Sequence, residues 1–446
     1  MSGMWRIGWV LVLLVMLPAT ARALQPVEVT SEENVTAWLV EDHTVPAFSL
    51  NVRLRHAGSA NDPAGKEGLA SLTAALLKEG AGERDSAAFH DALDFYAIRL
   101  SADVSRDDMN ISLTSLSEHA DMAFSLLHDM LADPHFAQPD VERLKSQQQA
   151  ALLQAQGDAG YQAQKAFYET AFAGHAYAKP QEGTAETIAA IGVGDVLAYK
   201  ASHLKRGEMT FSVTGDLSAA RLKELLEKYM DPLPEGESLS PELDTVTPAL
   251  AQEKAIRVDV PQTVVYFALP GIKREDASYY VAYIMNHLFG GSGLSSRLAL
   301  EIREKRGLAY YATSDLADYD KAALLVGSFA TRNDQAAQAI AALKEVVAAA
   351  GRDGFTQEEF DEAVSYLTGA FPARLTSNGS VTAYLDSMQR YHLGKEYLEK
   401  RNGYLEAVTL EEVNALAKTL FKPENLLIIT AGNPAPTAPD TGEKQQ

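Results

Sequence analysis

An internal repeat restricts this chain of 446 residues to folds that are built from two similar halves. Each half ends in an apolar run that is followed by a glycine turn, at Gly215 in "VTGDL" and at Gly432 in "ITAGNP", 217 positions apart. The segments "FAQPDVERLK" from Phe136 and "FTQEEFDEAV" from Phe355 also correspond, 219 positions apart. Two matches at nearly one offset favour a duplicated domain over coincidence.

The pattern within each half predicts the α+β class. Each half begins with an extended run, from Ala47 and from Gln262, and short alternating segments such as "IRLSADVS" and "MNISLTSL" follow one another closely. Long Ala- and Leu-rich helical segments are interleaved with them. Strands joined by short turns pair antiparallel, so we expect in each half a mainly antiparallel sheet with helices packed on one face.

The two predicted domains span residues 24–230 and 254–446. Between them, "DPLPEGESLSPELDTVTPALAQE", residues 231–253, is rich in Pro, Glu and Ser and is typical of an interdomain linker. A disordered tail is expected from about residue 435.

The first 23 residues have the pattern of a cleaved secretory signal. Arg6 precedes an apolar run, residues 7–17, and Ala21-Arg22-Ala23 provides a small-x-small cleavage site. The alternative is a membrane anchor, but the run is shorter than the ~20 residues that a spanning helix needs. We therefore expect an exported chain without stable membrane insertion.

Charge and composition exclude several functions. The formal net charge of −21 argues against nucleic acid and anionic membrane surfaces as partners. The chain has no cysteine, which excludes thiol catalysis and thiolate metal sites.

Common catalytic motifs are missing as well. None of the ten histidines lies three or four positions from another, so no helix offers a zinc site by itself. The sequence contains no G-x-S-x-G elbow and no Walker-type glycine loop, and no triad supports an independent hydrolase.

One segment, "GGSGLSSRLALEIREKRGLAYYA", combines glycines with a guanidinium and a phenol. Gly290, Gly291 and Gly293 predict either a helix terminus or a loop that lets the backbone approach a ligand. Arg303 and Tyr310 lie seven positions apart with a glycine between them, so a turn there brings both side chains into one cleft, as a pair that can bind a peptide carbonyl or a carboxylate. The alternative is that Arg303 belongs to a solvated run of charges.

The run "LFGGSGLSSRLALEIREKRGLAYYA", the duplicated halves and the strand ends "VTGDL" and "ITAGNP" resemble the M16 family of zinc metallopeptidases, which includes pitrilysin and the mitochondrial processing peptidase. The resemblance covers nearly all of the chain after residue 23. It implies two homologous M16-type domains, related to the LuxS/metallohydrolase-like fold.

The zinc motif of this family is degenerate here. Active members carry His-x-x-Glu-His on an N-terminal helix; aligned on "GLAS", the two histidine positions hold Ser71 and Ala75, and the glutamate position holds Ala74. The downstream helix "ERLKSQQQAALLQAQ" has glutamine and alanine where the further glutamate ligand falls. The resemblance therefore implies no metal and no catalytic residue in this chain.

The second family signature is retained, since Arg303 and Tyr310 match a substrate-binding pair of the C-terminal half. Some bacterial members divide the zinc motif and this pair between two chains. The resemblance thus implies a periplasmic, zinc-free subunit that binds peptides beside the zinc of a partner subunit. It also implies that Gly290, Gly291 and Gly293 take part in binding the peptide. The rival hypothesis is an M16-type scaffold or peptide-binding protein, in which the pair has no role.

Overall fold

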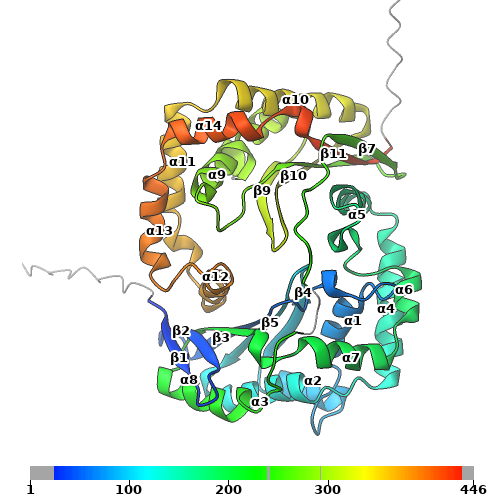
Figure 1. Cartoon of the computed structure of the whole chain (residues 1–446), viewed down its shortest axis with the longest axis vertical. Helices are drawn as coiled ribbons and strands as arrows, with labels where there is room; N and C mark the ends of the chain where they lie inside the picture. The colour runs from blue at the N-terminus through cyan, green and yellow to red at the C-terminus, as the bar shows by residue number, and fades with distance from the viewer. Residues whose placement is uncertain (1–24, 239–241, 292, 434–446) are drawn as a thin grey trace, which may run out of the picture.

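The computed structural model describes residues 25–238, 242–291 and 293–433, arranged as two halves that lie one above the other in Figure 1. The predicted signal segment, the tail from about residue 435 and residues 239–241 of the predicted linker lie outside the described residues. Among the described residues, no helix is both long and apolar enough to cross a bilayer.

The first half contains a six-stranded sheet in the order β1-β2-β6-β3-β5-β4. Only β2 and β6 pair in parallel; the other neighbours are antiparallel. The strands are β1 (Val27–Thr30), β2 (Thr36–Glu41), β3 (Ala47–Leu54), β4 (Arg99–Val104), β5 (Met109–Leu116) and β6 (Met209–Gly215).

The second half repeats this topology in a five-stranded sheet, β7-β11-β8-β10-β9, with one parallel pair, β7 and β11. Strand for strand, β2-β6-β3-β5-β4 corresponds to β7-β11-β8-β10-β9, which confirms the predicted α+β class with two similar halves. The strands are β7 (Gln252–Arg257), β8 (Gln262–Pro270), β9 (Ala312–Tyr319), β10 (Ala322–Arg332) and β11 (Leu427–Gly432).

The helices follow the strands in a matching order. In the first half they are α1 (Leu69–Leu76), α2 (Ser86–Phe95), α3 (Ala120–Ala132), α4 (Gln138–Ala155), α5 (Ala159–Ala171), α6 (Ala185–Ala190), α7 (Val193–His203) and α8 (Ala219–Leu225). In the second half they are α9 (Tyr279–Asn286), α10 (Ala336–Asp353), α11 (Gln357–Gly369), α12 (Asn378–Arg390), α13 (Tyr397–Glu406) and α14 (Leu410–Leu420). Among these, α9, α11 and α12 take the places that α1, α4 and α5 have in the first half.

One face of each sheet packs on helices of its own half. Strand alternation separates the two faces: Leu50, Val52 and Leu54 of β3 lie in one apolar core, and Val265 and Phe267 of β8 lie in the other. These residues are fully or almost fully buried.

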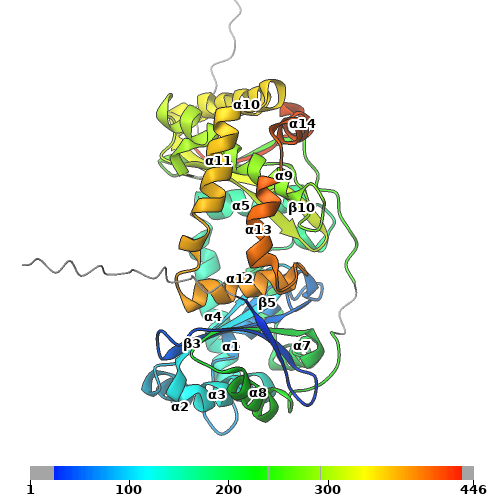
Figure 2. The same cartoon turned by 90° about the vertical axis from the view of Figure 1, so that its left-hand side faces the viewer.

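The opposite face of each sheet is covered by a helix from the other half, which the prediction of helices on one face did not include. Helix α12 packs on β3 and β6, and α5 packs on β8 and β11, as Figures 1 and 2 show. The Thr382 hydroxyl of α12 donates to the carbonyl of Ser49 on β3 at 3.3 Å. Each half is therefore incomplete without the other.

A buried ion network crosses the same junction. Arg53 of β3 pairs with Asp386 of α12 and, at 2.6 Å, with Asp108 of the β4–β5 turn. Arg390 of α12 pairs with Asp108 at 3.2 Å and with Asp320 of the β9–β10 turn at 3.1 Å. The halves are thus joined by charges as well as by apolar contacts.

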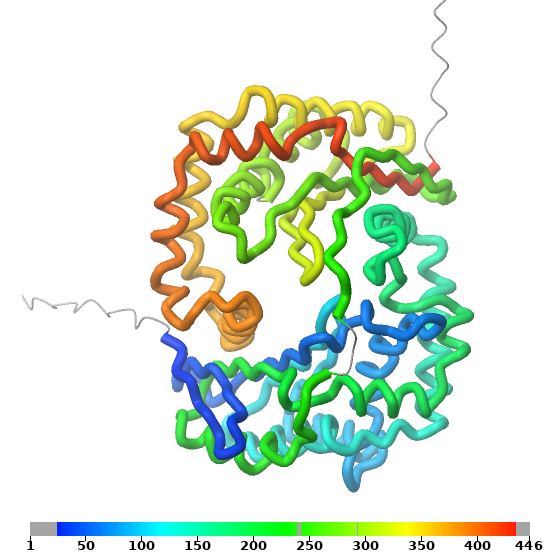
Figure 3. The backbone as a smooth tube through the Cα atoms, viewed as in Figure 1, coloured from blue at the N-terminus to red at the C-terminus, as the bar shows by residue number. Residues whose placement is uncertain are grey.

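The predicted linker runs between the halves without helix or strand over residues 242–251 and enters β7 at Gln252, two residues before the predicted boundary (Figure 3). Several hydrogen bonds attach its backbone, among them those of Val246 N–H to the carbonyl of Lys321 at 3.0 Å and of Ala249 N–H to that of Ala171 at 2.7 Å.

Candidate functional site

The degenerate zinc motif lies on α1, which packs against α4 and β4. The helix begins after Gly68, which has φ +93° and no capping side chain. Asp62 replaces the cap: its carboxylate accepts the N–H groups of Gly68 and Ala70 at 2.8 and 2.9 Å. Ala74 is buried, and Ser71 is half-buried at the surface that faces α4.

A chain segment, residues 180–185, is clamped over this surface. The Ser71 hydroxyl donates to the carbonyl of Gln181 at 3.0 Å, and the Gln148 amide of α4 donates to the carbonyl of Glu182 at 2.8 Å. The Gln181 side chain donates to the carbonyl of Val104, at the edge of β4. The polar residues left at the degenerate motif and on α4 therefore bind protein backbone.

Zinc does not fit at this place. A catalytic zinc needs about three protein ligands, whereas Ala74 and Ala75 carry only methyl groups and the Ser71 hydroxyl is already bonded to Gln181. Within the described residues, no group of three or more His, Asp or Glu side chains is placed to hold a metal ion.

Arg303 and Tyr310 are brought together by a tight turn, as their spacing predicted. Arg303 lies in a π-helical segment, Ala299–Glu304, and the chain reverses at Gly307, which has φ +61°. Leu308 is buried in the core, and its carbonyl accepts the Thr331 hydroxyl at 2.6 Å. This anchor returns the chain so that the Arg303 guanidinium carbon lies 5.4 Å from the centroid of the Tyr310 ring.

The surroundings distinguish Arg303 from the charges next to it. Lys305 pairs with Glu301 at 2.6 Å, and Arg306 pairs with Glu345 at 2.8 Å. In the described part of the chain, no carboxylate lies within ion-pair distance of Arg303, and the Tyr310 hydroxyl makes no hydrogen bond. The Tyr310 side chain is 84% exposed. The pair is therefore available to a ligand at the surface.

The three predicted glycines lie in different environments. Gly290 is buried in a π-helical turn, His287–Gly291, that packs against β9. Gly291 ends this turn and is exposed. Gly293 has φ +47° and begins a short exposed turn, Gly293–Ser295.

Replacement of Gly290 by alanine is expected to destabilise the chain by about 1–3 kcal/mol, because a Cβ would lie 2.4 Å from the Ser314 hydroxyl and 2.8 Å from its backbone nitrogen. Gly293→Ala is the control: nothing lies within 4 Å, and its φ of +47° predicts a loss of only about 1 kcal/mol. Urea denaturation measures both variants. A Gly290→Ala loss no larger than that of Gly293→Ala would contradict close packing on β9.

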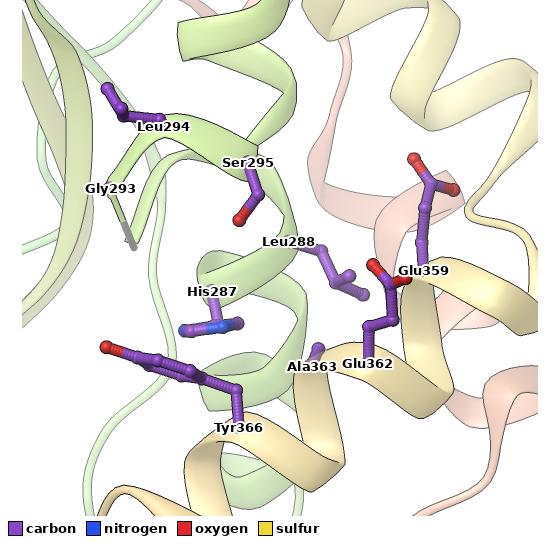
Figure 4. A pocket seen from close by; sticks show the side chains of 9 residues that line it. All are labelled: His287, Leu288, Gly293, Leu294, Ser295, Glu359, Glu362, Ala363 and Tyr366. Carbon is purple, nitrogen blue, oxygen red and sulfur yellow. The ribbon is translucent and has the colours of Figure 1, made fainter.

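A cavity of about 430 Å³ lies between the π-helical turn after α9 and the first turns of α11. Its lining is His287, Leu288, Gly293, Leu294, Ser295, Glu359, Glu362, Ala363 and Tyr366 (Figure 4). By the internal repeat it occupies the place that residues 180–185 cover on α1 and α4. Of this lining, sequence reasoning named Gly293 and missed the other residues, because the correspondence of α9 with α1 becomes visible only in the sheet order.

The cavity walls have a neutral and an anionic side. Burial, with a smaller contribution from the Arg374 charge, lowers the pKa of His287 to about 4, and the ring stacks on Tyr366 at 5.4 Å. Burial works against ionisation of Glu359, but Arg297, in a bidentate pair at 2.8 and 2.9 Å, and the cap at Thr356 outweigh it and lower its pKa to about 2. At neutral pH His287 is therefore uncharged and Glu359 is ionised.

Stability is expected to fall as the pH drops from about 6.5 to about 4. Burial also lowers the pKa of His203 to about 4. In this window the unfolded state binds protons on both histidines and the folded state does not, so acid favours unfolding. His287→Gln should reduce the number of protons taken up on unfolding at pH 5 by about one. This number is the slope of the unfolding free energy against pH, measured by urea denaturation between about pH 6.5 and pH 4. Glu359→Gln, whose effect lies below about pH 4.5, is the control; equal slopes for wild type and His287→Gln would contradict the assignment.

The comparisons with known proteins agree with this topology. A family model described as the peptidase M16 inactive domain matches residues 190–367, and a model described as insulinase, peptidase family M16, matches residues 39–185. The non-peptidase homolog YmxG of Helicobacter pylori is 29% identical over 430 residues, which are 95% of this chain and 97% of that protein.

Two solved structures have the same fold. The peptidase M16 inactive domain from Pseudomonas fluorescens is 26% identical, with a TM-score of 0.86 over 92% of this chain and 98% of that one. A protease from Helicobacter pylori has a TM-score of 0.82 over 92% of this chain and 100% of that one; at 16% identity it shows the fold alone. With two successive M16 models, a relative matched over nearly its whole length and the duplicated sheet order, the chain belongs to the M16 peptidase family.

Proposed function

We propose that this chain is a zinc-free subunit of a periplasmic, heterodimeric M16 metallopeptidase, and that it presents Arg303 and Tyr310 to peptides held at the zinc site of a partner subunit. The observation that supports this most is the contrast between the two family sites. Arg303 is half-buried and lies against the exposed ring of Tyr310, whereas α1 carries no zinc ligand and its polar positions bind residues 180–185. The names of the YmxG homolog and of the Pseudomonas fluorescens structure fit a chain that does not hydrolyse peptides by itself.

The pair suits the negative charge that develops on a carbonyl oxygen during hydrolysis. A guanidinium offers fixed N–H donors with a full charge, and a phenol adds one directed donor. The stacking of Arg303 on Tyr310 orients the two groups before a substrate binds. Such pre-oriented donors stabilise an oxyanion more than the neutral carbonyl, which is how this chain contributes to catalysis at the zinc of the partner subunit.

Co-expression with an exported M16 protein that carries His-x-x-Glu-His tests the proposal. We expect the lone chain to bind no stoichiometric zinc and to cleave no peptide, and the purified complex to contain one zinc and to cleave peptides faster than the partner alone. Zinc is measured by atomic absorption and cleavage with a quenched fluorescent peptide. Cleavage by the lone chain with stoichiometric zinc would overturn the proposal, and equal turnover with and without this chain would favour the scaffold role.

A further inference from the structure

A second cavity, of about 240 Å³, lies beside the degenerate motif, between α5, the β4–β5 turn and residues 178–182. Although the chain is strongly acidic, three of the lining residues are basic and one is acidic. Tyrosine rings form part of the wall. The residues that matter are Arg106, Lys165, Lys179, Glu182, Tyr161 and Tyr168.

Arg106 is held in place without a counter-charge. Its guanidinium carbon lies 3.3 Å above the Tyr168 ring, and its Nε donates to the carbonyl of Tyr177 at 3.1 Å. Across the residues that the structure describes, no carboxylate lies within ion-pair distance of it, and its two terminal nitrogens make no hydrogen bond to protein. A guanidinium that is fixed in this way binds a carboxylate with little further loss of side-chain freedom.

The lysines at the cavity are only partly neutralised. Lys165 lies 3.9 Å from Glu169, one turn further along α5, with about two fifths of each side chain exposed. Lys179 lies 3.3 Å from Glu67. An exposed pair such as that of Lys165 contributes about 0–1 kcal/mol, so it competes weakly with an incoming anion. The pair of Lys179 is more buried, and the Lys179 ammonium also donates to the carbonyl of Asp62 at 3.4 Å.

Size and charge narrow the class of ligand. At about 240 Å³ the cavity is smaller than the roughly 300–1,000 Å³ of sites that enclose a whole small molecule. It therefore accommodates one carboxylate with its nearest atoms. The net charge of −21 disfavours polyanions such as nucleic acids and polyphosphates.

Aromatic rings continue from the cavity wall to β8. The Phe167 ring lies 5.4 Å from Tyr168 of the cavity wall and 6.1 Å from Tyr266 of β8. Tyr266 is half-buried. Rings of this kind offer a peptide apolar contact area beside a polar hydroxyl.

We propose that this cavity binds a carboxylate of the peptide substrate, with Arg106 as the anchoring cation and Lys165 and Lys179 at its sides. The carboxylate comes either from the C-terminus or from an acidic side chain. The inference deepens the proposed function and rests on it for the ligand class, a peptide. Gln181 and Glu182 line the cavity and also cover Ser71, so the segment that closes the degenerate motif forms part of the new site.

Fluorescence anisotropy of the lone chain tests the inference with three N-terminally labelled tetrapeptides. These are tetra-alanine with a free C-terminus, its C-terminal amide, and an amidated peptide with one glutamate. We expect wild type to bind at least one carboxylate-bearing peptide about tenfold more tightly than the plain amide, and Arg106→Met to abolish this preference. Tighter binding of the peptide with the free C-terminus would identify the C-terminal carboxylate as the ligand, and tighter binding of the glutamate peptide would identify an acidic side chain. Equal affinity of wild type for all three peptides, or no binding below about 1 mM, would overturn the inference.

Further variants separate a binding defect from a folding defect. Lys165→Met should weaken the preference several-fold, whereas Lys223→Met, which removes the same i,i+4 lysine–glutamate pair from α8, should leave it unchanged. Gln164→Glu adds a carboxylate to the cavity wall and should abolish the preference by repulsion if Arg106→Met fails to fold. A preference that survives in Gln164→Glu would overturn the inference.

The double variant Arg303→Ala/Tyr310→Phe distinguishes this inference from the proposed function. It should keep the carboxylate preference of the lone chain while lowering turnover in the complex. If wild type shows no preference for carboxylate-bearing peptides while turnover of the complex still depends on Arg303, the carboxylate site is refuted and the proposed function is not. If wild type shows the carboxylate preference while turnover of the complex does not depend on Arg303, the proposed function is refuted and the carboxylate site is not.

Discussion

Replacing Arg53 by methionine should lower the free energy of unfolding by about 3–5 kcal/mol. The guanidinium is the shared counter-charge of Asp108 and Asp386, and only 8%, 4% and 8% of the three side chains is exposed. Burial disfavours the charge on Arg53, but Asp386 and then Asp108 outweigh this and raise its pKa. Methionine would therefore leave Asp108 with Arg390, and Asp386 buried without an ion-pair partner among the described residues.

Urea denaturation followed by circular dichroism measures this loss. Arg352→Met is the matched control, because Arg352 pairs with Asp353 while 70% and 56% of these side chains are exposed, so a change of no more than about 1 kcal/mol is expected. Adding Asp386→Leu to Arg53→Met should recover part of the loss by removing one unpaired charge. If Arg53→Met were as stable as Arg352→Met, apolar packing alone would hold the halves together.

The repeat made the architecture predictable. Gly215 and Gly432 are the last residues of β6 and β11, which take equivalent places in the two sheets, and Phe136 and Phe355 precede α4 and α11. Alternation of apolar residues in "MNISLTSL" also identified β5, whose burial alternates along the strand. These signals are local or depend on one offset, so a single sequence is sufficient to show them.

The exchange of α5 and α12 was not predictable from the sequence. An apolar helix face has the same 3.6-residue period whichever sheet it covers, so periodicity does not tell which half a helix packs on. The ion pair between Arg53 and Asp386 joins residues 333 positions apart, and no local pattern links them. Ser49, Asn51 and Arg53 alternate with the core residues of β3 and are buried on the face that α12 covers, although polar side chains at these positions are typical of a solvent-exposed face.

Sequence reasoning reached the two candidate sites unequally. The spacing of Arg303 and Tyr310 around Gly307 is sufficient to predict a turn that brings them together, and the structure has that turn. Arg106 gave no signal, because it lies in a short polar turn and its importance depends on Tyr168 and Tyr177, more than 60 positions away. A lone basic residue in a turn is indistinguishable from solvated surface until its partners are known.

In the reconstituted heterodimer, Arg303→Ala should lower kcat by about 10²–10³-fold, the effect expected for one lost oxyanion donor. Tyr310→Phe removes one neutral hydrogen-bond donor and keeps the ring that stacks on Arg303, so its effect should be smaller. Because the donors act on the transition state, kcat and kcat/KM should fall together. The double variant should lose less than the product of the single effects, since the two groups bind one oxygen.

Steady-state cleavage of one fluorescent peptide by the complex gives these values, and size-exclusion chromatography checks that every variant still forms the complex. Arg306→Ala is the control: Arg306 belongs to the same charged run but pairs with Glu345 and Glu301, so turnover should stay within about twofold of wild type. A similar drop for Arg306→Ala would mean that the whole cationic segment acts through its charge on the partner. Unchanged turnover for Arg303→Ala with normal assembly would leave the chain a purely structural subunit. Because Arg303 alone in this segment lacks a carboxylate among the described residues, the two arginines should differ sharply.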